Sequence, residues 1–296
     1  MPEVSVVVPS IQGWPAIAQT LEAIRDQADG RPVEVVVVDG SDRPEPPEDA
    51  RWPGLRWLRA PGRSTYQLRP LGYRATSGSL VAVTEDHCIP AADWIERIVA
   101  AHAAYPRAAV VGGAIENASP EQVVARAAFL VTHTRFMPPL PRGPAEHLPG
   151  PANLSFKRHV LERIPEHGSL GVVEGFDGAA LAAEGEILIL DDRIRVGHRH
   201  AFDLREESAI QFHDGRTAAG FRRTVMDRRD WLRLAALGLL PFARSLRGAT
   251  TATRKGVPPR RVAGALPLIV WLQLCHALGE LVGYASGPGT SPGKLV

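Results

Sequence analysis

Short apolar runs alternate with amphipathic stretches along the first 120 residues. Residues 4–8 and 33–38 are rich in valine, with almost no polar alternation. Such runs are typical of strands buried on both faces of a parallel sheet. Three shorter apolar runs predict further strands, at residues 55–58, 80–84 and 110–115.

Between these runs the apolar positions recur at helical spacing. Ile17, Leu21 and Ile24 predict a helix after the first strand, and residues 66–76 predict another in spite of Pro70. Pro90 is expected near the start of a third helix. Strands alternating with helices favour an α/β fold, a doubly wound and mostly parallel sheet with flanking helices.

The second half of the chain is less regular. Residues 137–151 contain six prolines and predict a loop. Helices are expected near residues 157–164 and 175–183, and a strand near 187–190. After residue 221 the character changes to arginines and apolar stretches. We therefore predict a catalytic domain over residues 1–221 and a basic, apolar helical tail over 222–296.

The tail contains two apolar segments. Residues 231–243 are too few to span a bilayer, which takes about 20 residues. A helix over residues 267–285 would be just short of a typical span, and Gln273, His276 and Glu280 would form one polar stripe on it. A stripe favours a helix that lies in the membrane interface or packs on a partner helix.

Charge is distributed unevenly along the 296 residues. The net charge is +2, but residues 222–261 hold 11 of the 34 Lys and Arg and only two acids. The rest of the chain is acidic, so the tail needs an anionic partner. We expect an anionic membrane surface and no nucleic acid. Two distant cysteines and the absence of a signal-peptide pattern favour a reducing compartment. Basic stretches next to apolar segments stay on the cytoplasmic side, so we predict peripheral or monotopic attachment at the cytoplasmic face of the membrane.

Acidic clusters follow two of the predicted strands. Asp39 ends the second strand, and the triplet Glu85-Asp86-His87 follows the run at 80–84. In doubly wound sheets, ligands bind beyond the carboxyl ends of the strands. Both clusters are also compatible with turn or loop acids that bind nothing.

Together with later motifs, these residues resemble the family 2 glycosyltransferases of the GT-A fold. The resemblance covers about residues 3–225 and depends on the order and spacing of its motifs. These are VSVVVP at 4–9, VVVDGSD at 36–42, EDH at 85–87, NLSFKR at 153–158, Glu174, and VGH at 196–198.

The resemblance implies a nucleotide-diphosphate sugar as donor. It leaves the acceptor unknown, and a lipid-linked acceptor is compatible with the tail. Asp39 would contact the nucleotide. Glu85 and Asp86 would also bind the donor. The remaining expected contacts with the nucleotide sugar are Pro9, Ser10, Ser41 and Arg69.

The resemblance also implies a divalent metal, Mn²⁺ or Mg²⁺, held by Asp86, His87 and His198. His200 is the substitute for His198. The triplet Glu-Asp-His replaces the family's Asp-x-Asp, which leaves the metal's identity open. Imidazole suits Mn²⁺ better than Mg²⁺.

For an inverting transfer, Glu174 is the expected general base and Asp177 the alternative. A helix N-terminal acid that complements the dipole is the simpler interpretation of Glu174. Arg216 and Arg222 are further candidates for contacts with the diphosphate. Two competing hypotheses are a nucleotidyltransferase, whose glycine-rich phosphate loop is missing here, and an inactive scaffold of the same fold.

Overall fold

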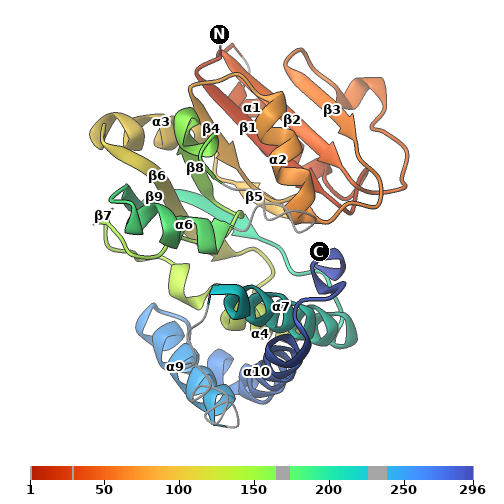
Figure 1. Ribbon diagram of the computed structural model, residues 1–296, viewed down its shortest axis with the longest axis vertical. Coiled ribbons are helices and arrows are strands. Elements are labelled where there is room, and N and C mark those ends of the chain that lie inside the picture. Colours follow the sequence, from red (N-terminus) through yellow and green to blue (C-terminus); the bar gives the residue numbers. More distant parts are fainter. Residues whose placement is uncertain (1, 29, 165–173, 226–238, 296) are drawn as a thin grey trace. The chain divides into compact units, whose positions relative to one another are not determined.

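The computed structural model describes residues 2–28, 30–164, 174–225 and 239–295. The chain divides into two compact units. The first contains Met1–Ala118 and Pro138–Arg199, and the second contains Ser119–Met137 and His200–Val296. Helix α7 (Leu204–Val225) runs without a break through residues 221 and 222, where the sequence predicted a domain boundary (Figure 1).

The first unit is built on one mixed sheet with strand order β3-β2-β1-β4-β8-β6-β9-β5, and β7 pairs with β9. The expected α/β class is confirmed. The strands are β1 (Val4–Ser10), β2 (Val33–Asp39), β3 (Leu55–Arg59), β4 (Leu80–Val83), β5 (Cys88–Pro90), β6 (Ala108–Asn117), β7 (Gly143–Pro144), β8 (Leu154–Lys157) and β9 (Ile187–His198).

Parallel pairing dominates the part of the sheet that carries the first two acidic clusters. Strands β3, β2, β1 and β4 are all parallel, so their carboxyl ends meet at one edge. Strand β8 runs antiparallel to both β4 and β6, and β9 returns parallel to β6. The first unit's helices are α1 (Ala18–Ala28), α2 (Thr65–Ala75), α3 (Trp94–Ala104), α5 (Arg158–Leu161) and α6 (Glu174–Ala183), with the 3₁₀ turn η1 (Glu48–Ala50).

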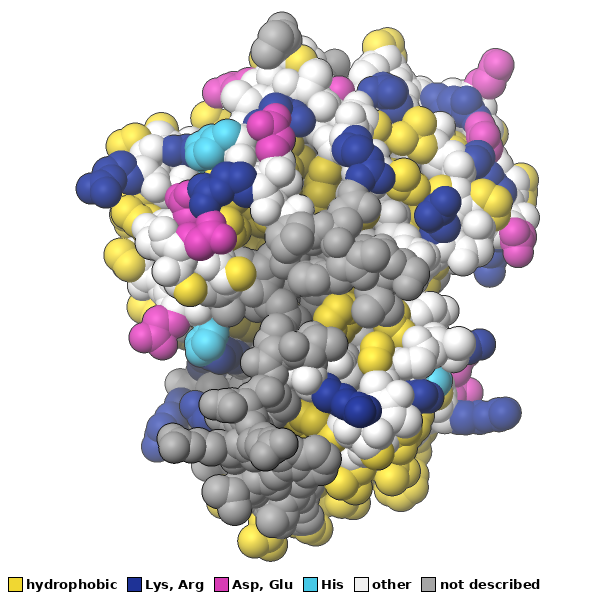
Figure 2. Space-filling model, in the orientation of Figure 1, with side chains coloured by type: hydrophobic (Ala, Val, Ile, Leu, Met, Phe, Trp, Pro, Cys, Tyr) yellow, Lys and Arg dark blue, Asp and Glu magenta, His cyan; other side chains and the backbone are white. Residues whose placement is uncertain are grey.

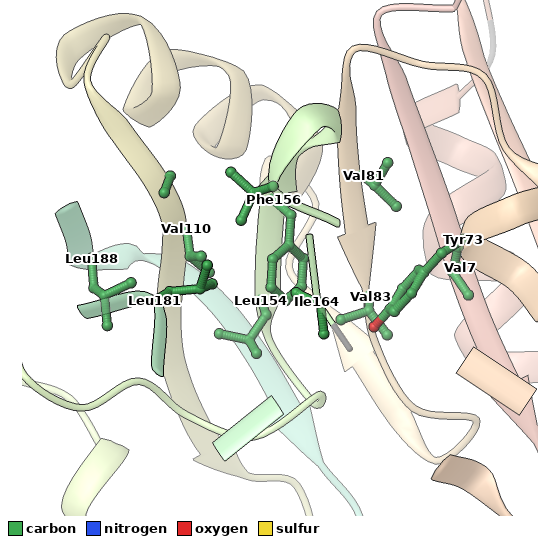
Figure 3. Packing of buried hydrophobic residues seen from close by; sticks show 12 residues of the cluster. Val7, Tyr73, Val81, Val83, Val110, Leu154, Phe156, Ile164, Leu181 and Leu188 are labelled. Atoms are coloured by element: carbon green, nitrogen blue, oxygen red, sulfur yellow. The ribbon is translucent and has the colours of Figure 1, made fainter. Parts of the chain in front are cut away.

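Side-chain alternation on β8 shows how the two faces of the sheet are covered. Leu154 and Phe156 lie in a buried cluster with Tyr73 of α2 and Leu181 of α6 (Figure 3). Ser155, between them, instead lies 3.0 Å from Nε2 of a histidine in α3. The sheet therefore has helices on both faces, as the doubly wound pattern predicts.

Several elements differ from the sequence prediction, among them β7 inside the predicted loop at 137–151 and α5, which is shorter than the helix expected near 157–164. Pro90 lies in the short strand β5, and helix α3 begins only at Trp94. The segment 154–157 is a central strand that we did not predict. Strand β9 continues to His198, well beyond the run at 187–190, because it pairs with β6 over residues 187–191 and again over 195–198.

The second unit is helical. It contains α4 (Val123–Thr132), α7, α9 (Leu240–Arg254) and α10 (Pro259–Ser286), with 3₁₀ turns η2 (Thr134–Phe136) and η5 (Ser291–Lys294). Helix α10 packs on α7, α9 and α4. Of the described helices, it is the one long and apolar enough to cross a membrane by length and composition.

Helices α7 and α10 approach each other through glycines. A methyl group at Gly279 of α10 would come within 2.0 Å of the carbonyl oxygen of Phe212 in α7. One at Gly215 of α7 would come within 2.1 Å of the carbonyl oxygen of His276. Gly283 continues this close approach one turn further along α10. Small residues at this spacing let two helix backbones touch, as they do in membrane helix pairs.

A buried ion cluster joins three helices of this unit. Glu280 of α10 is only 1% exposed, and it accepts hydrogen bonds from Arg222 of α7 and Arg244 of α9 at 2.7–3.1 Å. His276 lies 3.8 Å from Glu280 and 3.4 Å from Asp214. The predicted polar stripe of α10 therefore faces partner helices. Arg222, a candidate for the diphosphate, is engaged in this cluster, and Arg216 donates to the carbonyl of Gly287.

Large apolar side chains lie on the opposite face of α10. Trp271 is 50% exposed and Leu278 is 56% exposed. Figure 2 shows hydrophobic side chains gathered along the lower margin of the helical unit. We call the exposed large apolar side chains of α10 the apolar face: Leu266, Trp271, Leu274, Leu278 and Leu281. Leu239, Phe242 and Leu246, around α9, are exposed as well.

Candidate active site

The functional side chains of the first unit come from the carboxyl-terminal edge of the sheet. Ser10 and Asp39 end β1 and β2, and Glu85, Asp86 and His87 follow β4. Pairing of Cys88 with His198 in the antiparallel β5–β9 ladder then brings the end of β9 to this triplet.

Three side chains converge there. Nε2 of His87 lies 2.9 Å from Nε2 of His198. Oε2 of Glu85 lies 3.5 Å from the first of these nitrogens and 3.4 Å from the second. Burial opposes protonation of His87, but its hydrogen bond to Asp86 and the charges of Glu85 and Asp86 raise its pKa above the usual value. The environment therefore favours positive charge at this point.

The spacing of these three atoms fits a divalent metal ion. Ligands about 2.1 Å from one ion are about 3.0–3.4 Å apart in octahedral or tetrahedral geometry. A carboxylate oxygen with two imidazoles suits Mn²⁺ or Zn²⁺ better than Mg²⁺. Cys88 belongs to the same group of potential ligand atoms, all within 4.8 Å of one another. Burial and the nearby acids raise the pKa of its thiol well above the usual value.

Asp86, predicted as a metal ligand, occupies a different place. Its Oδ2 accepts hydrogen bonds from Ser10 Oγ at 2.8 Å and from the backbone N–H groups of Ile11 and Gln12 at 3.1 Å each. Its Oδ1 lies 2.9 Å from Nδ1 of His87. Both oxygens are engaged beside the ligand group, and Glu85 provides the carboxylate oxygen instead.

Asp39 is fully buried at the end of β2. Its Oδ1 accepts from the backbone N–H of Ser41 at 2.8 Å, and its Oδ2 accepts from Trp57 at 3.2 Å and Arg59 at 2.5 Å. Sequence reasoning missed both partners on β3, although the register pairs Asp39 with Arg59. The guanidinium of Arg59 is the partly exposed member of this pair.

The loops that follow β1 and β2 touch each other. Gly13 has a φ of +62°, and a methyl group there would come within 2.1 Å of Ser41 Oγ. Pro9 and Ser10 are buried at the end of β1, and Ser41 is buried as well. Only glycine suits this backbone and this close approach. The structure thus brings together Ser10, Ser41, Asp39 and the triplet at 85–87.

The remaining predicted site residues are Arg69, Glu174, Asp177 and His200. Arg69 is buried in α2, and its guanidinium carbon lies 4.8 Å from the ring centre of Tyr66. Glu174 begins helix α6 and Asp177 follows one turn later, but their side chains lie outside the described part of the structure. His200 belongs to the second unit, where it lies 3.2 Å from Glu207.

A model of glycosyl transferase family 2 matches residues 5–164, more than half of the chain. The chain belongs to glycosyl transferase family 2. It is a glycosyltransferase of the GT-A fold, so the family match favours sugar transfer from a nucleotide sugar over the nucleotidyltransferase and scaffold hypotheses. In the comparison with curated proteins, nothing matches the chain.

Solved structures of glycosyltransferases share this fold. The chain is similar to the mannosyltransferase PcManGT from Pyrobaculum calidifontis in complex with GDP-Man and Mn²⁺, with 19% identity and a TM-score of 0.62 over 96% of this chain and 87% of that chain. It is also similar to S. aureus TarS 1-349, with 12% identity and a TM-score of 0.50 over 92% and 90%.

Asn153 of this glycosyltransferase has a structural role that its family motif did not reveal. Its amide nitrogen donates to the carbonyls of Ala114 and Ile194 at 2.8 and 3.0 Å, and its amide oxygen accepts from Trp94 Nε1 at 2.9 Å. It thereby ties β6 and β9 together where their register shifts, next to Gly113. The strand that carries His198 is fixed through this residue.

Proposed function

We propose that this glycosyltransferase moves a sugar from a nucleoside diphosphate sugar to an acceptor hydroxyl with inversion at the anomeric carbon, and that it uses a divalent metal. The convergence of Glu85, His87 and His198 carries the proposal. An ion held by these three residues would supply Lewis acidity and offset the charge on the leaving diphosphate. Mn²⁺ is the proposed ion, because two of the three ligand atoms are imidazole nitrogens.

The remaining residues of the site divide into two roles. Ser10, Ser41 and the Asp39–Arg59 pair lie beside the metal group at the same sheet edge and are proposed to receive the nucleotide, together with Pro9 and Arg69. Glu174 is proposed as the general base. It takes the acceptor hydroxyl's proton as the new glycosidic bond forms and the bond to the diphosphate breaks. Asp177 is the alternative base.

Binding of GDP and UDP, and of their sugars, is measured by calorimetry with and without Mn²⁺. We expect Mn²⁺ to strengthen binding of one nucleotide by about tenfold or more. His198→Ala should remove that gain, whereas His147→Ala, at an exposed histidine of the same unit, should keep it. A gain that persists in folded His198→Ala contradicts the metal assignment.

The general base is tested by turnover. Glu174→Gln should lower kcat by about two to four orders of magnitude while donor affinity stays the same. Asp177→Asn is the matched control and should keep most of the turnover. The opposite pattern would assign the base to Asp177, and full activity in both variants would exclude either carboxylate.

We also propose that the helical unit lies on the cytoplasmic face of an anionic membrane. The observation behind this is its distribution of polarity. Glycines, Gln273 and the Glu280 ion cluster face the partner helices, whereas the apolar face carries Trp271 and four leucines on α10 alone. A patch of this kind marks an interaction surface. Arg247, Arg254 and Arg260 are exposed close by in sequence and complement anionic headgroups.

The charged face of α10 argues for lying in the interface rather than spanning. Glu280 is held by arginines from α7 and α9, so a span by α10 alone would break these ion pairs or carry their charges into the bilayer. A lipid-linked acceptor is compatible with this placement and is proposed with it. Residues 231–238 of the first apolar segment lie outside the described part of the structure.

Flotation with vesicles tests this placement. Full-length protein should float with vesicles containing 30% phosphatidylserine, and salt should release only part of it, because apolar insertion does not depend on screening. Leu274→Glu/Leu278→Glu should abolish flotation, whereas Val123→Glu, at an exposed position on α4, should not. Dimerisation of the wild type that the double variant abolishes, without flotation, would instead identify a second copy as the partner.

A further inference from the structure

Asp86 connects two parts of the site through its two carboxylate oxygens. Oδ2 accepts three hydrogen bonds from the loop after β1, donated by Ser10 Oγ and by the backbone of Ile11 and Gln12. The hydroxyl of Ser10 in turn accepts from the N–H of Gly13 at 2.9 Å. One oxygen atom therefore organises the whole turn of residues 10–13.

The second oxygen acts on His87. An ionised carboxylate is only an acceptor, so Nδ1 of His87, 2.9 Å from Oδ1, must carry the proton. In the neutral imidazole, the lone pair of the other ring nitrogen, Nε2, is then directed towards Glu85 and His198. A carboxylate that fixes the tautomer of a metal-facing imidazole also raises its basicity as a ligand.

The backbone of Asp86 is held as firmly as its side chain. Its carbonyl accepts from Thr20 Oγ1 at 2.9 Å, and the residue is 3% exposed. A side chain that is buried this deeply and bonded through both oxygens could turn towards the ligand group only by breaking contacts already made.

We infer that Asp86 is a positioning residue that orders the loop of residues 10–13 with one carboxylate oxygen and sets the tautomer of His87 with the other. The nucleotide-facing loop and the metal-facing histidine thus depend on one shared side chain. The link to nucleotide binding rests on the proposed function, whereas the link to the metal group does not.

Two substitutions separate the two oxygens. In Asp86→Asn the amide oxygen can still accept from the loop, but the NH₂ group faces Nδ1 of His87, which must then become an acceptor. The ring proton moves to Nε2 and blocks the metal-facing lone pair. Asp86→Ala removes both sets of contacts, and Ser10→Ala weakens only the loop.

Full-length variants are titrated with Co²⁺, followed by its visible absorption, and with GDP and UDP in EDTA. Asp86→Asn should lose about 10–100-fold in Co²⁺ affinity while its metal-free nucleotide affinity changes by less than about tenfold. Asp86→Ala should lower the Co²⁺ affinity and the nucleotide affinity, each by about tenfold or more. Ser10→Ala should lower only the nucleotide affinity. Nitrogen-15 shifts of His87 should show Nδ1–H in the wild type and Nε2–H in Asp86→Asn.

Three outcomes overturn the inference. If both Asp86 variants lose Co²⁺ affinity equally while their nucleotide affinity is unchanged, Asp86 is a direct metal ligand. Unchanged Co²⁺ affinity in both, with loss in His198→Ala, would remove any positioning role. An unchanged His87 tautomer in Asp86→Asn would exclude the proposed route. If the wild type binds neither nucleotide but the Co²⁺ and tautomer differences appear, the proposed function fails and the positioning of His87 stands.

Discussion

At the scale of single residues, the amide of Asn153 shows how a buried polar group fixes the site from a distance. It makes three side-chain hydrogen bonds, to β6, β9 and α3. Asn153→Asp has the same shape, but a carboxylate cannot donate to the carbonyls of Ala114 and Ile194. We expect a loss of about 2–4 kcal/mol in unfolding free energy, at least as large as for Asn153→Ala. Urea unfolding measures the free energy of unfolding of both variants. A nearly unchanged value for Asn153→Asp would contradict this role.

Asp39 and Arg59 give a second prediction at this scale. Arg59→Met leaves the buried carboxylate with only Trp57 and the Ser41 backbone as partners, and it should cost about 1–3 kcal/mol of stability. Asp39→Asn/Arg59→Met should recover part of that cost, because no buried charge remains. A double-mutant cycle from thermal unfolding gives the coupling energy, and additive effects would show that the pair is not coupled.

Sequence reasoning named two of the three side chains that form the proposed metal group, and it named Asp86 in place of the third, Glu85. It named His87 and His198 from their motifs, and the structure brings them to 2.9 Å. It chose Asp86 where Glu85 lies in the group, because three consecutive polar residues after a strand do not reveal which side chains turn inward. Trp57 and Arg59 were missed because their role depends on the β2–β3 register, a long-range pairing.

At the scale of elements, the packing of α10 on α7 depends on glycines. Gly279→Ala would place a methyl group 2.0 Å from the carbonyl oxygen of Phe212, and backbone at this distance cannot yield easily. We expect a loss of several kcal/mol in stability, about 2–4. Gly264→Ala on the same helix has nothing within 4 Å and should be neutral or stabilising by up to about 1 kcal/mol. Similar melting temperatures for the two variants would contradict this packing.

The ion cluster of the same helices predicts a pH dependence. Burial opposes the charge of His276, but Asp214 and Glu280 raise its pKa to about 9. A raised pKa stabilises the fold fully below about pH 6.5, the unfolded value, and this contribution disappears as pH rises through about 9. The lowered pKa of Glu280 acts only at acid pH and does not change in this range.

Unfolding between pH 6.5 and 9.5 therefore tests the cluster. The helical unit should lose on the order of 2–3 kcal/mol over this range, and His276→Gln should flatten the curve. An unchanged slope in that variant would place the titrating group elsewhere.

Helices and strands were predicted correctly where the apolar positions had one clear periodicity. Strand β8 was missed, because its residues were considered only as a family motif. The valine runs became β1 and β2, and the polar stripe of α10 was found before its partners were known. The four residues of β8 carry too little alternation for a prediction. The glycines of α10 carry no hydrophobic signal, so their packing role needed the structure.

At the scale of the whole molecule, residues 119–137 and 200–296 form one unit, although they are separated in sequence. Truncation after residue 221 would remove α9 and α10 and expose the faces of α4 and α7 that pack on α10. We expect residues 1–221 to aggregate or to lose helicity rather than to form a soluble body. Size-exclusion chromatography and circular dichroism measure this, and a monodisperse, fully helical fragment would support the boundary at 221.

The order of the ion cluster along the chain has a consequence for biosynthesis. Arg222 and Arg244 precede Glu280 by 58 and 36 residues. The ribosome therefore makes Arg222 and Arg244 before the carboxylate that pairs with them. The ion pairs that join α7, α9 and α10 can therefore form only after Glu280 has been made, late in synthesis.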